Sequence, residues 1–402
     1  MPVIISQSMF DEAENSMSRS PGACNTMGTA STLDCMVEAL GMSLPGAAAI
    51  PAVDASRRRA ARLSGRRIVG MVQEELRMSQ ILTRDAFENA IIVNAAIGRS
   101  TKFILHLLAI AGRIEVPLTL SDFDVLSQNI PLLANLKPSG EFLMEDFYYA
   151  GGIPAVISQL RHKLHDNVIQ CNGKTLSENY VDASIFNPLV IVPAEQALIK
   201  DAGTIVLRGN LCTDGAVIKP TTTPALLNHQ ARAVVFENIE NYNQRINDPQ
   251  LDVTPDDILV LKGTGPRGYP GMPEVGNFGM PLKLVQQGVR DMIRISDGRM
   301  SGTAFGTIVL HVSPEATVGG TLALVRNSDI IELNCHERRL TLNVSEEELA
   351  RRKEQWRPPL LDYPRGYTHL YIQSVEQAHT SADLNFLPGK SGGHIQREPH
   401  PE

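Results

Sequence analysis

The sequence of 402 residues lacks several features that would place it in a specialised class. No apolar run reaches the roughly 20 residues that cross a bilayer, so we expect a soluble protein. The first residues have no basic region ahead of their apolar stretch, which argues against a secretory signal. Basic residues are outnumbered by acidic ones. The formal net charge of -7 therefore argues against a nucleic-acid partner, which normally requires a basic face.

Cysteine is also scarce, with five residues and no close C-x-x-C spacing. An odd count without that spacing argues against a disulfide framework and indicates a reducing compartment, so we expect a cytoplasmic protein. Cys24 lies in a glycine-bounded turn ahead of an expected helix, where the helix dipole favours a thiolate that could bind a metal or cluster. No other cysteine shows ligand spacing around it, so the residues alone favour a structural Cys24.

The length and the change of pattern along the chain predict two domains. A chain of 402 residues exceeds the usual size of one core, and near residue 202 helical periodicity gives way to short β-like runs. We therefore predict an α/β fold with a helix-rich domain over residues 1–197 and a β-rich domain over residues 198–402. Strands are predicted at 204–208, 216–219, 233–236, 258–261, 307–312, 322–325 and 330–333.

Capping signals place several helices in the first domain. Thr83 predicts a helix over 84–96, and Ser100 or Thr101 predicts one over 102–111. Ser121 with Asp124 resembles a capping box that opens another helix. His106 lies within the apolar stripe of its helix, so we expect it to be buried and hydrogen-bonded. The basic run at 57–67 is expected to be a solvated helix face, with attraction of acidic substrates or a partner subunit as the alternative.

Two glycine-rich segments carry the strongest chemical signal. Gly263-Thr-Gly-Pro-Arg-Gly-Tyr-Pro-Gly-Met-Pro-Glu274 can wrap a charged ligand, because glycine lets backbone amides approach closely and proline stiffens the loop. Glu274 is its one acid. Ser296-Asp-Gly-Arg-Met-Ser-Gly302 places Ser301 in a glycine turn ahead of an apolar run, where a nucleophile or base can be held in a fixed pose. Either segment alone could equally be an ordinary loop.

The first of these segments contains a G-x-G-x-x-G pattern after an expected strand, as a dinucleotide site would. Such a site needs a helix that opens directly from the last glycine, so that its N-terminus meets the pyrophosphate. Pro270 and Pro273 prevent a helix there. We therefore reject the nucleotide interpretation.

Taken together, four segments resemble the dihydroxy-acid and sugar-acid dehydratases, the family that includes 6-phosphogluconate dehydratase. They occur in the family's order across nearly the whole chain. The amino-acid sequences of the segments at 268–276 and 311–315 are most similar to those of the arabinonate and xylonate dehydratase branch. The four matching segments are Cys24-Asn-Thr-Met-Gly-Thr-Ala-Ser31, His106-Leu-Leu-Ala-Ile-Ala-Gly112, Gly265-Pro-Arg-Gly-Tyr-Pro-Gly-Met-Pro-Glu274 and Ser296-Asp-Gly-Arg-Met-Ser-Gly302.

The resemblance implies a swivelling β/β/α unit as the second domain and a hydro-lyase activity. Water is removed from a 2,3-dihydroxy acid to give a 2-keto-3-deoxy acid, with an iron–sulfur cluster, of the 2Fe-2S type, and Mg²⁺ as cofactors. By matching motifs, Cys24 is a cluster ligand, Glu274 a magnesium ligand and Ser301 the base, with Thr303 near the substrate. The resemblance also implies a homo-oligomer, either dimer or tetramer, with a small acid as its ligand.

The chain departs from the family pattern in two respects. Further cluster cysteines and magnesium ligands belong upstream of the Cys24 motif, so the sequence resembles an N-terminally truncated dehydratase, and a longer form could be mitochondrial. At Gly98-Arg-Ser-Thr-Lys102 the family favours a second glycine and an asparagine, whereas this chain has Arg99 and Lys102. Two other functions stay open: the dihydroxy-acid dehydratase of branched-chain amino-acid synthesis, and a non-catalytic remnant that retains subunit contacts.

Overall fold

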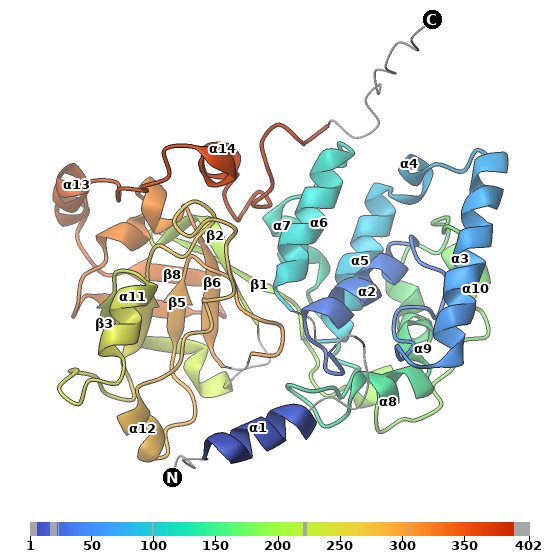
Figure 1. The fold of residues 1–402 in the computed structure, drawn as a ribbon, viewed down its shortest axis with the longest axis horizontal. Helices are drawn as coiled ribbons and strands as arrows, with labels where there is room; N and C mark the ends of the chain where they lie inside the picture. The colour runs from blue at the N-terminus through green and yellow to red at the C-terminus, as the bar shows by residue number, and fades with distance from the viewer. Residues whose placement is uncertain are drawn as a thin grey trace, which may run out of the picture.

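The computed structural model describes residues 6–16, 22, 24–98, 100–219, 223–304 and 306–389. A helix-rich part is followed along the chain by a β-barrel, and the two lie side by side (Figure 1). This mixed α/β architecture confirms the predicted order of a helical part before a β-rich part. The boundary at 197/198 stays a prediction. Within the described residues, no helix is both long and apolar enough to span a membrane.

The helix-rich part is built around one buried helix. Every residue from Ala86 to Ala96 except Glu88 is buried, because small and apolar side chains cover most of the circumference of α5. The Thr83 hydroxyl caps this helix by accepting the Ala86 N–H, as predicted. The helices of this part are α1 (Gln7–Ser16), α2 (Thr29–Ala39), α3 (Ala55–Gln73), α4 (Met78–Ile81), α5 (Arg84–Ala96), α6 (Lys102–Arg113), α7 (Leu120–Leu126), α8 (Met144–Tyr149), α9 (Gly152–Leu160) and α10 (Leu176–Tyr180).

Two predictions about these helices are wrong. The capping box of α7 is formed by Thr119 and Asp122, not by Ser121 and Asp124, since the same spacing occurs two residues earlier and begins the helix there. His106 is exposed, because the apolar residues of α6 pack on both sides of its position and leave the imidazole at the surface between them.

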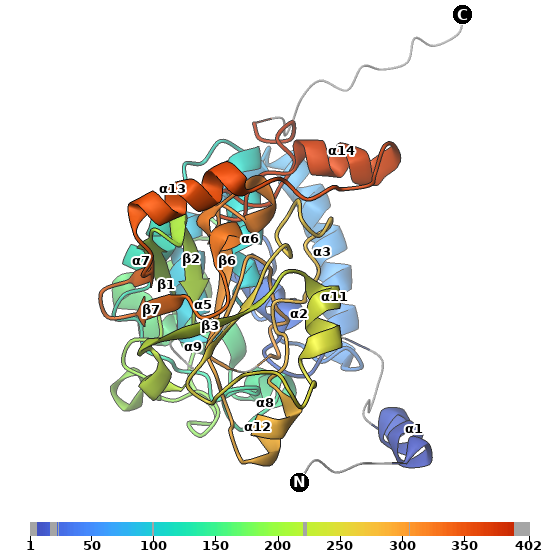
Figure 2. The same ribbon diagram turned by 90° about the vertical axis from the view of Figure 1, so that its left-hand side faces the viewer.

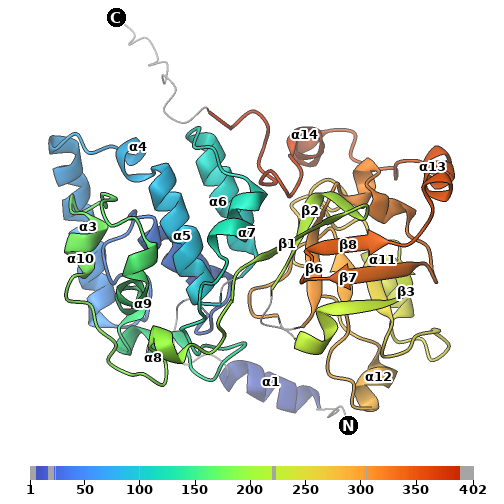
Figure 3. The same ribbon diagram turned by 180° about the vertical axis from the view of Figure 1, so that it is seen from behind.

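The second part is a closed barrel with strand order β1-β2-β6-β5-β4-β3-β7-β8. β3, β4, β5 and β6 pair in parallel. β7 lies between β3 and β8 (Figure 3) and pairs antiparallel with both. A parallel pair between β1 and β8, at Arg208 and Arg339, closes the barrel. The strands are β1 (Ile205–Gly209), β2 (Cys212–Ile218), β3 (Asn228–Phe236), β4 (Ile258–Leu261), β5 (Arg294–Ser296), β6 (Ile308–Ser313), β7 (Ile330–Asn334) and β8 (Arg339–Leu342).

The predicted strand at 322–325 is wrong, because Thr321–Leu324 forms a 3-10 helix. The two strands that the pattern missed, β5 and β8, have three and four residues and are too short to show an alternating pattern. A charged helix begins directly after Ser345, whose side chain accepts the Glu348 N–H. The helices of this part are α11 (Ile239–Arg245), α12 (Leu282–Gln286), α13 (Glu346–Gln355) and α14 (Gly366–Ser374).

The C-terminal segment connects the barrel to the helix-rich part. After α14, Gln377 exchanges hydrogen bonds with Glu315: Gln377 Nε2 donates to Oε1 at 2.7 Å, and the Glu315 N–H donates back at 2.9 Å. Asp383 then accepts two hydrogen bonds from Arg113 of α6, both at 2.8 Å. Figure 2 shows α13 and α14 at the same end of the molecule.

Candidate functional site

The glycine-rich loop at 263–274 is held by two buried carboxylates. Asp297, which directly follows β5, accepts the N–H groups of Gly263, Thr264 and Ala316 at 2.8–3.2 Å. Glu315 accepts the N–H groups of Arg267 and Gly268 at 2.9–3.1 Å. Burial raises the pKa of both carboxyl groups, while these backbone donors favour the charged forms. These hydrogen bonds therefore hold the loop in place. The loop contains no helix, which agrees with our rejection of a dinucleotide site.

Gly265 shows how closely this loop lies on its support. A Cβ atom at Gly265 would be 2.5 Å from Glu315 Oε2 and 2.7 Å from Glu315 Cβ. Only glycine allows such an approach. The glycines therefore allow the loop to lie close to the carboxylates, and they also determine the shape of the loop.

Ser301 lies in the turn between β5 and β6 and is half-buried. Its Oγ is 3.0 Å from Thr303 Oγ1 and accepts the Thr303 N–H at 3.4 Å. Thr303 therefore offers two potential donors to the same serine oxygen. Hydrogen bonds to an oxyanion stabilise it, so the turn favours the alkoxide form more than a solvated serine would.

Gly302 joins this turn to the helix-rich part. Its N–H donates to Thr29 Oγ1 at 3.3 Å, at the first residue of α2. A Cβ atom at Gly302 would be 2.7 Å from the carbonyl carbon of Gly28 and 2.8 Å from Ser100 Cβ. The turn therefore touches the start of α2 and the residues just before α6. In Figure 1 both helices lie on the side of the helix-rich part that faces the barrel.

Cys24 belongs to the same neighbourhood. Its Sγ lies 3.1 Å from Thr26 Oγ1, and a Cβ atom at Gly28 would lie 3.7 Å from that hydroxyl and 3.1 Å from the Thr303 methyl group. The thiol is exposed, as a cluster ligand must be before it binds. Four further cysteines are buried in cores elsewhere: Cys35, Cys171, Cys212 and Cys335.

This donor set does not fit an iron–sulfur cluster. A cluster is held by several converging thiolates, and among the described residues Cys24 is the single cysteine that reaches the site. The four buried thiols cannot turn toward Cys24 without opening the cores around them. Cys24 as one cluster ligand stays a prediction, and the other ligands would have to come from outside the described residues.

Glu274 forms an ion pair with Lys102, the first residue of α6, through its Oε1 and the lysine Nζ. The lysine side chain is 3% exposed and the glutamate side chain 41%. Burial and the Arg299 guanidinium lower the pKa of Lys102 to about 8. The donor set here does not fit magnesium directly, because the carboxylate oxygen that a metal would use already accepts an ammonium. Glu274 as a magnesium ligand stays a prediction.

Other basic groups surround this pair. Arg299 is half-buried and donates to the carbonyl oxygens of Met272 and Gly271 at the end of the glycine-rich loop. The pKa of His311 is lowered, first by burial and then by the charges of Arg299 and Lys102. Its imidazole is therefore neutral, and the positive charge of the site resides on the lysine and the arginine.

His311 has a special position within β6. It is 2% exposed, its φ is +57°, and its N–H donates to the Gly298 carbonyl at 3.1 Å rather than across the sheet. The pairing register with β2 shifts at this point, as in a β-bulge. Burial together with Arg299 and Lys102 lowers the pKa of His311 to about 3. Sequence reasoning missed this residue, because an isolated histidine in an apolar run gives no sign of a bulge.

The structure thus brings Cys24, Glu274, Ser301 and Thr303 into one neighbourhood where α2 and α6 meet the barrel. Lys102 was recognised in the sequence only as a departure from the family pattern. The available signal was a positively charged residue at the start of a helix whose next residues are apolar. The pairing with Glu274 needed the fold, since the two residues lie in different parts of the structure.

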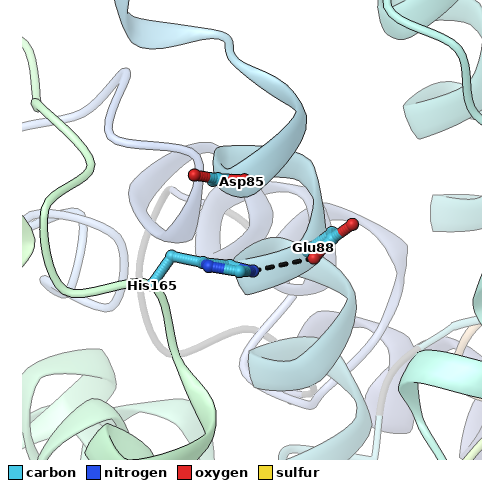
Figure 4. A group of neighbouring side chains, drawn as sticks. All are labelled: Asp85, Glu88 and His165. Atoms are coloured by element: carbon cyan, nitrogen blue, oxygen red, sulfur yellow. Dashed lines mark hydrogen bonds and ion pairs between the residues drawn. The ribbon is translucent and has the colours of Figure 1, made fainter.

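A separate group of potential metal ligands lies at the start of α5. Asp85, Glu88 and His165 bring one ligand atom each to within 4.8 Å of one another (Figure 4). Glu88 accepts Arg84 Nε at 2.7 Å and lies 2.7 Å from His165 Nε2. These contacts satisfy the Glu88 carboxylate without a metal, so the group is a surface ion-pair network.

Comparisons with known proteins identify the family. Residues 4–179 match the model of the dihydroxy-acid/6-phosphogluconate dehydratase N-terminal domain, and residues 189–382 match that of the C-terminal domain. An L-arabinonate dehydratase of Rhizobium leguminosarum is 53% identical over 400 residues, which cover 98% of this chain and 69% of the relative. An L-arabonate dehydratase of Azospirillum brasilense is 52% identical over 401 residues, or 97% of this chain and 69% of the relative.

Relatives with the other substrate class are less similar. A dihydroxy-acid dehydratase of Caldicellulosiruptor bescii is 40% identical over 366 residues, which cover 90% of this chain and 66% of the relative. The predicted resemblance is therefore confirmed, including the greater similarity to arabinonate dehydratases than to this dihydroxy-acid dehydratase. The chain belongs to the dihydroxy-acid/6-phosphogluconate dehydratase family.

Proposed function

We propose that the site between α2, α6 and the barrel binds a 2,3-dihydroxy sugar acid and removes its C2 proton, the first step of dehydration to a 2-keto-3-deoxy acid. The observation that carries this proposal is the placement of Ser301 beside a positively charged, partly buried surface. Arg299 is two residues before it, and Lys102 reaches the same region from α6.

Ser301 is proposed as the base. A serine hydroxyl is too weakly acidic to act as a base unless its alkoxide is stabilised. Thr303 supplies the N–H donor and a second hydroxyl at 3.0 Å, and the charges of Arg299 and Lys102 lower the cost of a negative oxygen. Preorganised donors of this kind need no rearrangement when the charge develops.

The same cations favour the acid substrate and the product of proton removal. Removing the C2 proton places a second negative charge next to the carboxylate, and a low-dielectric site with fixed positive charge stabilises that dianion. Thr303 is exposed beside Ser301 and is proposed as a contact to a substrate hydroxyl. Loss of the 3-hydroxyl needs an acid, which the described residues do not assemble, so proton transfer at C2 is the step that they support.

We propose a pentonate-type sugar acid as the substrate. Support comes from the arabinonate dehydratases that are 52% and 53% identical to this chain, against 40% for a dihydroxy-acid dehydratase. The branched-chain substrate 2,3-dihydroxy-isovalerate carries two methyl groups on C3, where a pentonate has a hydrogen and a two-carbon chain with two further hydroxyls. A site that hydrogen-bonds hydroxyls rejects an analogue without them, because its buried polar groups then stay unpaired.

The test is a parallel measurement of C2 hydrogen exchange with both acids in D₂O. Loss of the C2 proton signal is followed by nuclear magnetic resonance with L-arabinonate and with 2,3-dihydroxy-isovalerate at equal concentration. We expect the pentonate to exchange at a rate at least about tenfold higher. A higher rate with dihydroxy-isovalerate would support the branched-chain alternative. No exchange with either acid, with circular dichroism showing a folded chain, would favour the non-catalytic remnant.

A further inference from the structure

Lys102 occupies a position that is unfavourable for a cation unless an anion accompanies it. It is the first residue of α6, where the partial positive charge of the helix N-terminus repels an ammonium. Its side chain is 3% exposed, so water does not solvate the charge. The Arg299 guanidinium adds a further repulsion. Among the described residues, the Glu274 carboxylate is the anion that Lys102 pairs with, so the pair forms one electrostatic unit.

Among the described residues, Glu274 does not belong to a group of three or more His, Cys, Asp or Glu side chains that could hold a metal. Within the described ranges, the ligand atoms of one such group come together, and that group consists of Asp85, Glu88 and His165. Glu274 is not part of it. A divalent ion at Glu274 would therefore meet one carboxylate, the Lys102 ammonium and the Arg299 guanidinium. Magnesium prefers several oxygen ligands in octahedral geometry and is repelled by both cations.

We infer that Lys102 takes the place of a divalent cation at Glu274, so that this chain holds a fixed ammonium at that carboxylate. The inference deepens the proposed function, because the fixed charge then serves the same acid substrate, but the contacts alone carry it. Glu274 positions the ammonium, and the ammonium blocks the carboxylate from the metal.

The test is a titration with Mn²⁺, with free metal counted by electron paramagnetic resonance. All variants carry His165→Gln, which removes the imidazole of the α5 surface group from the measurement. Without further change, we expect weak binding that Glu274→Gln does not alter. Lys102→Asn frees the carboxylate and should tighten Mn²⁺ binding by about tenfold, which corresponds to about 1.4 kcal/mol. The double variant Lys102→Asn, Glu274→Gln should lose that gain.

Lys262→Asn is the matched control, since Lys262 is a buried lysine that pairs with the carboxylate of Glu237 away from the site. It should leave Mn²⁺ binding unchanged. The inference is overturned if Glu274→Gln alone weakens Mn²⁺ binding tenfold, or if the gain from Lys102→Asn persists in the double variant. The effect of Glu274→Gln alone on Mn²⁺ binding stays decisive even if Lys102→Asn does not fold. Because metal is counted and turnover is not, this inference and the proposed function can fail separately.

Discussion

Replacing Gly302 with alanine tests whether the turn that holds Ser301 is packed tightly against the helix-rich part. The new Cβ would lie 2.7 Å from Gly28 C and from Thr29 N, and 2.8 Å from Ser100 Cβ. Ordinary carbon contacts are about 3.5–4.0 Å, so three neighbours must each move by roughly 1 Å. Two of them are backbone atoms at the start of α2, which cannot move by rotating a side chain.

The expected loss of stability follows from two opposing effects. Overpacking of this kind costs about 1–3 kcal/mol. Alanine also restricts the unfolded chain, which returns about 0.4–1 kcal/mol. We therefore expect Gly302→Ala to lower the free energy of unfolding by about 1–2 kcal/mol, as measured by urea denaturation followed by circular dichroism and fluorescence.

Gly112→Ala is the matched control for this substitution. Gly112 lies within α6, and a Cβ there would meet no atom within 4 Å. Alanine in a helix is favoured over glycine, so this variant should be more stable by about 0.5–1 kcal/mol. If Gly302→Ala were as stable as the unmodified chain while Gly112→Ala behaved as expected, the turn would not be packed against α2 as described.

Two further predictions concern pH and the C-terminal segment. The folded-state pKa of His311 lies below its unfolded value, so its contribution to stability is present above pH 6.5 and is lost as the pH falls. Between pH 7.5 and pH 5, the unmodified chain should lose about 2 kcal/mol relative to His311→Asn, which keeps a side chain that tolerates positive φ; equal pH dependence would refute this. Asp383→Asn should weaken the contact with Arg113 by about 0.5–1 kcal/mol, the value of a half-exposed pair. Amide hydrogen exchange over residues 375–385 should then rise about two- to fivefold, and unchanged exchange would show that the segment is held by its other contacts.

The sequence was sufficient for features that depend on local chemistry. The Thr83 cap and the apolar periodicity of α5 predicted a helix whose bounds the structure reproduces. The prolines at 270 and 273 were enough to exclude a helix in the glycine-rich loop. Such signals depend on neighbours within one turn of the chain, so no knowledge of the fold is needed.

Predictions failed where two local signals competed or where packing decided. Thr119 and Ser121 both precede an acid by three residues, and only the helix itself shows which hydroxyl is used. His106 lies in an apolar sequence, yet burial of a helix face depends on the partner that covers it. The ion pair of Lys102 with Glu274 and the bulge at His311 arise from contacts between distant segments, which periodicity cannot reveal.

Exchange of the C2 hydrogen of L-arabinonate with deuterated solvent tests the central claim most directly. The substrate is incubated with the protein in D₂O, and loss of the C2 proton signal is followed by nuclear magnetic resonance. We expect the unmodified chain to catalyse exchange and Ser301→Ala to reduce its rate by at least about a hundredfold, in the range of general base catalysis. Thr303→Val should cause a smaller loss, because the Thr303 N–H still donates to the serine. Exchange at an unchanged rate in a folded Ser301→Ala variant would contradict the assignment of Ser301 as the base.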